Sequence, residues 1–216
     1  KSISDKDNTA TFEVIGEGTA KVIATSTQGD VSSEPVEITA IDSNIYIVFD
    51  EKTNTYYLER FHEKYTGYPG WTFLGGNWYY ADNQGTLQSG WQIINGKWYF
   101  FDHHNRDVMV TGWRQINGKW YYMNSSGAMV KGWAAVSGKW YYFNNSGAMV
   151  IGWAAISGKW YYLSSSGAMV KGWAAISGKW YYFNNSGAMV TGWASVSGKW
   201  YYFNNSGAMV TGWAAI

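Results

Sequence analysis

Fifteen tryptophans lie in this chain of 216 residues, and most of them stand at regular intervals. From Gly70 onward a Gly-Trp pair recurs about every 20 residues, and a second tryptophan follows seven residues after each of the first seven. The tryptophan pairs are Trp71 with Trp78, Trp91 with Trp98, Trp113 with Trp120, Trp133 with Trp140, Trp153 with Trp160, Trp173 with Trp180, and Trp193 with Trp200. Electron-rich rings attract cations through their quadrupoles. The spacing therefore indicates one recognition surface that is built several times.

Each tryptophan pair flanks a two-residue turn signal, such as Ser-Gly at residues 137–138. Such a dipeptide predicts a β-hairpin, because both positions of the turn need positive φ. Counting outward from the turn pairs Ala135 with Trp140, and Trp133 with Tyr142. Side chains alternate faces along a strand, so these four project from one face of the hairpin, with the small alanine between the indole rings. The pattern predicts a gap between two rings.

A gap between ring faces suits a quaternary ammonium ion, and choline is the standard ligand of such cages. This cation has no N–H to donate, so its recognition depends on cation–π attraction and on burial of its methyl groups. Two rings do not enclose a tetrahedral head, so a third ring should come from the next unit. We expect Tyr162, the second tyrosine of that unit, to supply it, and Met149 to close the floor with a soft side chain.

The repeating unit resembles the choline-binding repeat of Gram-positive surface proteins and phage lysins. The resemblance rests on Gly-Trp, five further residues and Lys-Trp-Tyr-Tyr-Phe-Asn-x-Ser-Gly-Ala-Met-Val, and it covers about 145 of the 216 residues. It implies a solenoid of β-hairpins whose sites lie between successive repeats. Each site would hold a choline or phosphocholine group of a teichoic or lipoteichoic acid, between two tryptophans of one repeat and an aromatic ring of the next.

The resemblance also implies which ring completes each site. The third rings are Phe100 for Trp71 and Trp78, Tyr122 for Trp91 and Trp98, Tyr142 for Trp113 and Trp120, Tyr162 for Trp133 and Trp140, Tyr182 for Trp153 and Trp160, and Tyr202 for Trp173 and Trp180. The connector methionines expected to line these sites are Met129, Met149, Met169 and Met189.

Two sites are expected to depart from this pattern. The connector at residues 101–109 carries two extra residues, which we expect to distort the site of Trp91 and Trp98. The last pair, Trp193 and Trp200, lacks a third ring in the sequence. We expect that site to be open or completed by another molecule, which would permit end-to-end self-association.

The chain divides into three parts. Residues 1–42 contain no tryptophan and alternate apolar and polar residues in three stretches, 11–15, 19–25 and 34–39, which predict antiparallel strands. The closing part of this segment resembles the last strands of a bacterial immunoglobulin-like surface domain. Residues 43–69 predict a hairpin, which we interpret as a degenerate repeat that caps the array.

Residues 70–216 form the array itself, and its last repeat is truncated. The predicted fold class is all-β, a β-hairpin solenoid of about 20-residue repeats preceded by a small β-sandwich-like segment. Both ends of the sequence fall inside a domain or a repeat. We therefore expect it to be part of a longer extracellular protein held at a bacterial cell wall.

Composition argues against several other functions. A net charge of +1 with 14% charged residues gives no electrostatic footprint for nucleic acid. The chain has no cysteine and no apolar run as long as the ~18–20 residues of a membrane span. His103 and His104 are expected to be solvent-exposed, so no metal or other cofactor is expected. No catalytic motif is present, and any enzyme is expected to lie outside this sequence.

Three other interpretations use the same residues. Glucan-binding and toxin carbohydrate-binding repeats have similar hairpins whose rings stack on sugars, although doubled tryptophans favour a cage over a flat platform. A structural spacer would only extend another domain from the surface. The tryptophans would be plain solenoid core in the third interpretation, but Ala134, Val136 and Tyr141 on the opposite face already supply a core-facing set.

Overall fold

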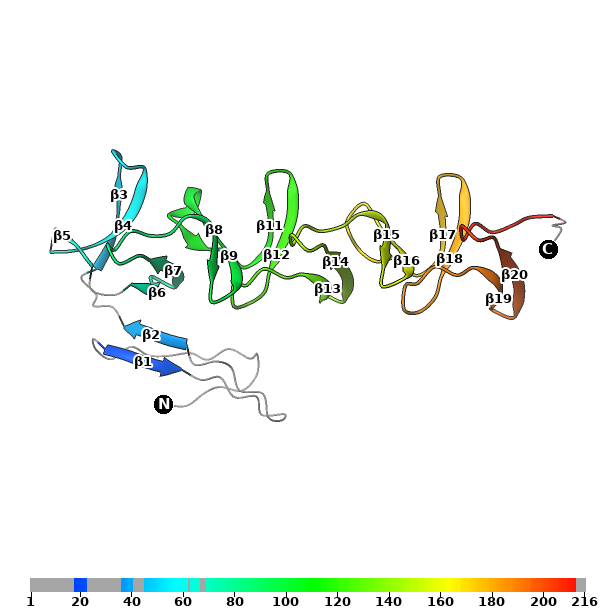
Figure 1. The fold of residues 1–216 in the computed structure, drawn as a ribbon, viewed down its shortest axis with the longest axis horizontal. Coiled ribbons are helices and arrows are strands. Elements are labelled where there is room, and N and C mark those ends of the chain that lie inside the picture. The colour runs from blue at the N-terminus through cyan, green and yellow to red at the C-terminus, as the bar shows by residue number, and fades with distance from the viewer. Residues whose placement is uncertain (1–17, 23–35, 41–44, 62, 67–68, 213–216) are drawn as a thin grey trace. The chain divides into compact units, whose positions relative to one another are not determined.

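The computed structural model describes residues 18–22, 36–40, 45–61, 63–66 and 69–212 of the chain (Figure 1). Their regular structure is β-strand apart from one short 3-10 helix, which confirms the predicted all-β class. The chain forms two compact units, residues 1–111 with 125–128, and residues 112–124 with 129–216. Within the described residues, no helix is long and apolar enough to cross a bilayer.

The first unit begins with an antiparallel pair, β1 (Gly18–Val22) and β2 (Val36–Ala40). Strand β2 then runs parallel to β6 (Gly70–Leu74) and pairs with it through Thr39 and Thr72. Two of the three strands predicted in this segment are thereby confirmed. The third, at residues 11–15, lies outside the described residues, and the immunoglobulin-like resemblance stays a prediction.

The hairpin predicted between residues 43 and 69 is present. Strands β3 (Ile45–Asp50) and β4 (Thr55–Arg60) pair in antiparallel register, and the short β5 (Glu63–Lys64) follows. Leu58 is completely buried beside Leu87 in an apolar cluster. The amide of Leu58 donates to the Gly85 carbonyl at 2.9 Å, so the hairpin is bonded to the connector of the following repeat.

The repeats are hairpins of two short strands. In the first unit they are β6 with β7 (Asn77–Ala81), and β8 (Gly90–Ile94) with β9 (Lys97–Asp102), to which β10 (Val108–Met109) adds. In the second unit they are β11 (Gly112–Ile116) with β12 (Lys119–Met123), β13 (Gly132–Val136) with β14 (Lys139–Phe143), β15 (Gly152–Ile156) with β16 (Lys159–Leu163), β17 (Gly172–Ile176) with β18 (Lys179–Phe183), and β19 (Gly192–Val196) with β20 (Lys199–Phe203).

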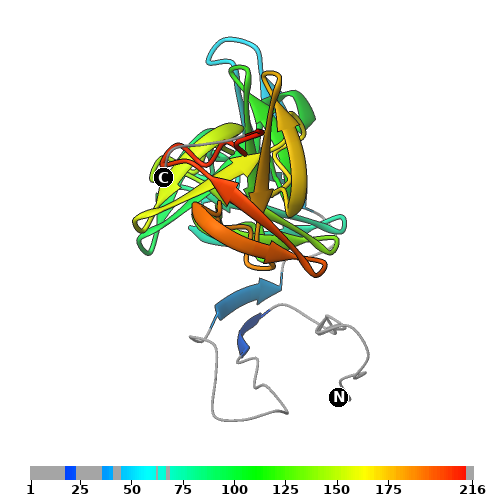
Figure 2. The same ribbon diagram turned by 90° about the vertical axis from the view of Figure 1, so that its right-hand side faces the viewer.

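The register predicted from the turn is confirmed. Trp133 stands opposite Tyr142, and Ala135 stands opposite Trp140. Ser137 and Gly138 have φ angles of 48° and 76°, the left-handed pair that a type I′ turn requires. Seen end-on, the hairpins of the second unit point in different directions around a common axis (Figure 2).

Within the second unit, a connector joins each hairpin from β13 and β14 onward to the hairpin before it. Met149 forms a β-bridge with Phe143 of its own hairpin, while its amide donates to the Trp120 carbonyl at 2.7 Å. The Asn144 carboxamide oxygen accepts hydrogen bonds from two connector amides, including that of Ala148 at 3.0 Å. These bonds hold the connector as a bridge between consecutive hairpins, and the completely buried Phe143 lies at the centre of the contact.

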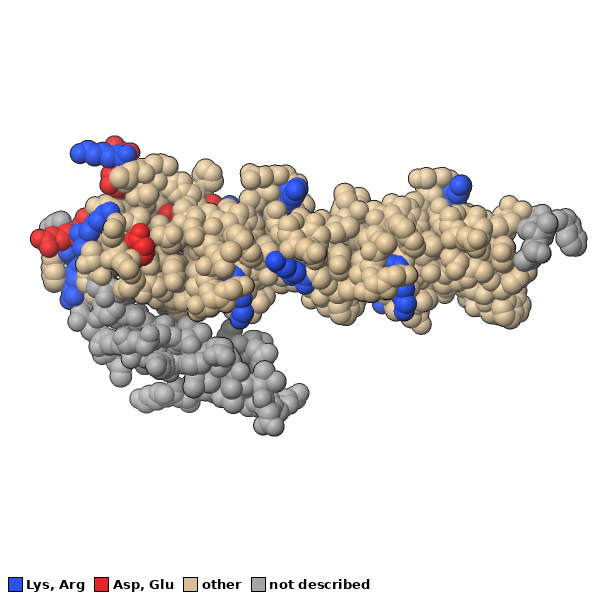
Figure 3. Space-filling model, in the orientation of Figure 1, with Lys and Arg blue, Asp and Glu red and all other residues tan. Residues whose placement is uncertain are grey.

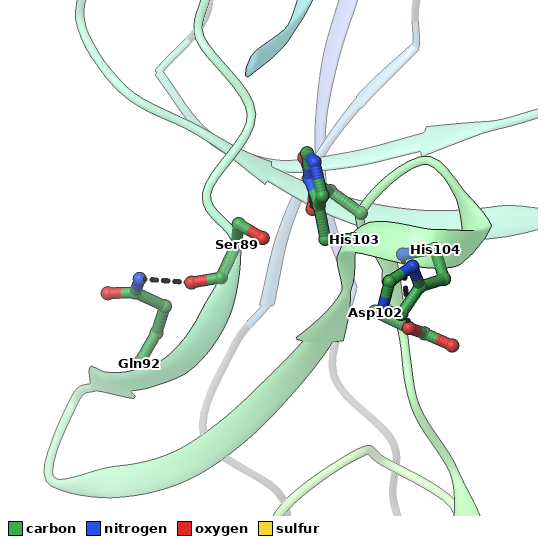
Figure 4. A network of polar contacts seen from close by, with 6 residues as sticks. Ser89, Gln92, Asp102, His103 and His104 are labelled. Carbon is green, nitrogen blue, oxygen red and sulfur yellow. Dashed lines mark hydrogen bonds and ion pairs between the residues drawn. The ribbon is translucent and has the colours of Figure 1, made fainter. Parts of the chain in front are cut away.

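The connector with two extra residues forms a compact turn (Figure 4). Asp102 caps the 3-10 helix His103–Asn105 by accepting a hydrogen bond from the His104 amide at 3.2 Å. His104 is exposed as predicted, but His103 is not fully solvent-exposed. Its ring packs 5.5 Å from that of Tyr56, and its Nδ1 lies 3.2 Å from a carboxylate oxygen of the buried Asp107. The turn therefore places this imidazole against the capping hairpin.

Candidate ligand-binding site

The two tryptophans of one hairpin form two walls that meet nearly at a right angle. The ring centroids of Trp113 and Trp120 lie 6.4 Å apart, with 82° between the ring planes. Trp173 and Trp180 repeat this arrangement at 6.3 Å and 81°. The same geometry recurs at 6.2 to 6.4 Å in the pairs Trp71 with Trp78, Trp91 with Trp98, and Trp153 with Trp160. The predicted placement of both rings on one face of the hairpin is thus observed.

The third ring comes from the next hairpin, but from its first tyrosine. Tyr161 lies 4.9 Å from Trp133, centroid to centroid, at 64°. The corresponding contacts, all at 4.8 Å, join Trp71 to Tyr99, Trp113 to Tyr141, Trp153 to Tyr181, and Trp173 to Tyr201. Each of these contacts lies within one compact unit, and each turns the two-walled corner into a three-sided cage.

The second tyrosines, which were predicted to form the third wall, pack within their own hairpins. Each packs on the first tryptophan of its own hairpin at 5.1 or 5.2 Å: Tyr122 on Trp113, Tyr142 on Trp133, Tyr162 on Trp153, Tyr182 on Trp173, and Tyr202 on Trp193. Phe100 does the same with Trp91 at 5.1 Å. These rings support a tryptophan wall from within the hairpin.

The physical reason is that consecutive hairpins meet through opposite faces. The tryptophan face of β11 and β12 contacts the other face of the next hairpin, which carries Tyr141 and Phe143. The prediction placed the third ring on the same face in both hairpins. Strand alternation alone identifies the two faces, but only the stacking of hairpins shows which face of the next hairpin reaches the gap.

One cage opens to solvent as a pocket of about 400 Å³. Trp133 and Trp140 line it from one hairpin, and Tyr161 and Met169 line it from the next. Met149, which was expected to close this cage, lies instead beside the preceding cage, that of Trp113 and Trp120. Its amide bonds to Trp120 and its sulfur packs against Gly167, whereas the Met169 amide donates to the Trp140 carbonyl at 2.7 Å. Each connector methionine therefore serves the hairpin that precedes its own.

Met189 follows the same rule, and Met129 shares its packing against a glycine. Met189 donates its amide to the Trp160 carbonyl at 2.7 Å, and its sulfur packs against Gly207. The Met129 sulfur packs in the same way against Gly147. Met149, Met169 and Met189 thus each lie at the contact that precedes the one predicted for them, and the place of Met129 in a site stays a prediction.

Exposure separates the cage rings from the core rings. Trp140 is 44% exposed, whereas Phe143 on the opposite face is completely buried. A core tryptophan would not leave so much apolar ring area in water, so the interpretation of the tryptophans as plain core is wrong for this ring. Trp193 and Trp200 are the most exposed, at 56% and 69%, and self-association through them stays a prediction.

Charge is distributed very unevenly along the chain. All fifteen acidic residues precede residue 108, whereas residues 108–216 carry eight basic residues and no acidic one. On the face shown in Figure 3, acidic side chains gather over the first hairpins and basic side chains follow the repeats. The cages of the second unit are therefore lined by ring faces with no carboxylate from residues 108–216.

Sequence reasoning missed three further residues of the pocket. Lys171, Asn185 and Ser186 complete its lining, the last two from the connector of a third hairpin. Lys171 stands two residues before Trp173, outside the hairpin whose residues the pattern predicts. One feature of the sequence could have pointed to Lys171. The residue two positions before the tryptophan of each Gly-Trp pair is charged in some repeats and uncharged in others.

Comparisons with known proteins identify the repeats. A family model described as a choline-binding repeat matches residues 110–152, 150–192 and 190–216, and one described as a putative cell wall binding repeat matches residues 70–87 and 89–102. A search of curated protein sequences gave no match.

Solved structures show similarity over most of the chain. Choline-binding protein F from Streptococcus pneumoniae, crystallised in the presence of a peptidoglycan analogue, is 33% identical, with 91% of this chain and 66% of that chain covered and a TM-score of 0.65. CbpJ from Streptococcus pneumoniae TIGR4 is also 33% identical, covering 94% and 68%, with a TM-score of 0.64. A complex of CbpF with ipratropium is 32% identical, covering 91% and 67%, with a TM-score of 0.65. The chain thus spans about two thirds of the length of these structures.

Proposed function

The chain belongs to the family of choline-binding repeat proteins and is a cell-wall-binding module; we propose that its choline sites are the three-sided cages between consecutive hairpins. Two tryptophans of one hairpin, with the first tyrosine and the connector methionine of the next, would form each site. Choline-binding repeats are non-catalytic modules. We infer that any catalytic activity would belong to other parts of the protein that carries this module.

The observation that carries this proposal is the pocket lined by Trp133, Trp140, Tyr161 and Met169. Its rings offer electron-rich faces from three directions, and each contact with a quaternary ammonium contributes about 0.5–2 kcal/mol. The methionine adds a polarisable apolar floor for the N-methyl groups. The solved complex of CbpF with ipratropium supports the assignment, because ipratropium also carries a quaternary ammonium group.

Repetition compensates for the weakness of a single cage. A site with a dissociation constant of ~1 mM contributes only about −4 kcal/mol. Several such sites on one polymer that carries many choline groups raise the apparent affinity by roughly 10²–10⁴ through effective concentration. The basic repeats also complement the phosphate groups of teichoic acids. We infer from this ligand that the module acts outside the cell membrane, on the wall.

Tryptophan fluorescence during titration with three ligands tests the proposal. Choline should change the emission with half-saturation near ~1 mM. Ethanolamine has the same charge but keeps its N–H groups and their hydration, so its affinity should be at least about tenfold lower. A soluble glucan should leave the emission unchanged. An emission that responds to glucan and not to choline would favour the carbohydrate-binding interpretation and exclude the cage.

A further inference from the structure

The pocket between Trp133 and Tyr161 has a polar side that a quaternary ammonium ion does not need. Lys171, Asn185 and Ser186 line it beside the aromatic walls. We propose that this pocket binds the phosphate that carries the choline, with Lys171 as the residue that makes it prefer phosphocholine to choline. This inference rests on the proposed function, because the rings must hold the choline head for the phosphate to reach the polar side.

Lys171 has no acidic partner in this part of the molecule. Residues 108–216 contain neither aspartate nor glutamate, and no ion pair of Lys171 is found among the described residues. An ammonium group beside a cage for a cation raises the free energy of binding a bare cation, because like charges repel at short range. An anion between the two cations reverses this effect. The phosphate of phosphocholine is such an anion, separated from the quaternary nitrogen by a short ethylene linker.

The neighbouring connector supplies an amide donor to the same side. No hydrogen bond of the Asn185 carboxamide is found among the described residues, so its N–H groups are available to a phosphate oxygen. The Ser186 hydroxyl already donates to the Asn184 side-chain oxygen at 2.6 Å. Lys171 and Asn185 are therefore the donors that this arrangement offers, and hydrogen bonds between a charged donor and phosphate are stronger than neutral ones.

The other cages of the second unit lack this combination. The position of Lys171 is occupied by Ile151 twenty residues earlier and by Thr191 twenty residues later. Ile151 is 58% exposed and offers no polar group. The position of Asn185 is again asparagine, Asn205, in the later cage. The cage of Trp153 and Trp160 thus matches the proposed phosphate site except for the lysine, which makes it an internal control.

Methionine methyl groups report each cage separately. The chain has seven methionines, so ¹³C-methyl labelling of the full chain gives a simple NMR spectrum that single Met→Leu variants assign. The chemical shift of the Met169 methyl group reports binding in the cage beside Lys171. The Met189 methyl group reports the cage beside Thr191, and the Met149 methyl group reports the cage beside Ile151. Choline and phosphocholine are the two probes, and their affinities are read at each methyl group in the same sample.

We expect phosphocholine to be favoured over choline more strongly at Met169 than at Met189, by about two- to fivefold, as for an exposed charge pair. Lys171→Thr should remove that preference by weakening phosphocholine without weakening choline, whereas damage to the pocket would weaken both. Thr191→Lys should create the preference at Met189. High salt should reduce the preference at Met169.

Three outcomes would overturn the inference. If the preference for phosphocholine over choline were equal at the three methyl groups and unchanged by Lys171→Thr, a contact between Lys171 and the phosphate would be excluded. Choline binding by the cages would still stand. Equal weakening of both ligands by Lys171→Thr would make the lysine structural. If neither ligand shifted any methyl group, the cage function itself would fail. Retention of the protein on choline-bearing teichoic acid is compared with its retention on phosphatidylcholine vesicles, which identifies the source of the phosphocholine. We expect Lys171→Thr to reduce retention on the teichoic acid only.

Discussion

Tyr161 and Tyr162 are adjacent in the sequence, yet their rings belong to different contacts. Tyr161 faces Trp133 of the previous hairpin at 4.9 Å, and Tyr162 faces Trp153 of its own hairpin at 5.1 Å. One ring is available to a ligand together with Trp140, while the other supports a wall. The two positions therefore allow ligand contact and structural support to be tested with substitutions of the same size.

Replacing Tyr161 with alanine should weaken choline at the cage of Trp133 and Trp140 by about 2- to 30-fold, the equivalent of one lost cation–π contact of about 0.5–2 kcal/mol. The readout is the choline titration of the Met169 methyl group. Tyr162→Ala is the matched control, and we expect it to leave that titration nearly unchanged while it perturbs the next cage through Trp153. A stronger effect of Tyr162→Ala at Met169 would restore the original assignment of the third ring.

The hairpin is the element that the sequence predicts best. The two-residue turn and strand alternation were sufficient to pair Trp133 with Tyr142 and to place both tryptophans on one face. The structure places the first tyrosine of the next hairpin, and not the predicted second one, beside the tryptophan pair, because no pattern within one hairpin specifies which face its neighbour presents. Met169 and Lys171 were misplaced or missed for the same reason, since both reach the pocket from connectors that fold back on the preceding hairpin.

Glycines in the connectors should be more sensitive to substitution than glycines in the turns. Gly158 and Gly167 have similar positive φ angles, 76° and 81°, so alanine introduces comparable backbone strain at either site. A Cβ at Gly158 meets no atom within 4 Å, whereas one at Gly167 would overlap the Met149 side chain. We expect Gly158→Ala to cost about 1 kcal/mol and Gly167→Ala about 1–3 kcal/mol more.

The midpoints of urea unfolding compare these two variants. Equal midpoints would show that the Met149 side chain moves aside without cost, which would contradict the close packing of connector and glycine. A Gly167→Ala variant that also carries Met149→Ala should regain part of the lost stability, because the overlapping atoms are then absent. An equal loss of stability in that double variant would show that the overlap with the Met149 side chain is not its cause.

At the scale of the whole molecule, the charge distribution should affect binding to an anionic polymer and binding to free choline in different ways. Residues 1–107 carry eight basic and fifteen acidic residues, a formal charge of −7, and residues 108–216 carry +8. The net charge of +1 conceals this separation, which is why composition alone gave no sign of an anionic partner. A positive surface of this kind attracts a polyanion over a distance that salt shortens.

Raising sodium chloride from about 0.05 to 0.5 M should therefore weaken retention on choline-bearing cell walls, as expected when the screening length shortens. Free choline is itself a cation, so its affinity in the same buffers should stay constant or rise slightly. Fluorescence titration measures the free ligand, and sedimentation with purified walls measures retention. Retention that did not change with salt would mean that the cages act without help from the basic residues.

The bonds between hairpins have a further consequence for how this molecule varies in length. In the second unit, the connector of each hairpin from β13 and β14 onward bonds to the hairpin before it, and the same methionine amide to tryptophan carbonyl bond recurs at every step from Trp120 to Met209. Every step is built from equivalent residues about twenty positions apart. Removing or duplicating one period would join equivalent backbone positions and leave the remaining steps chemically the same. The number of binding sites can thus change one repeat at a time through duplication of a short coding segment, because each added hairpin forms the same contacts as the existing ones.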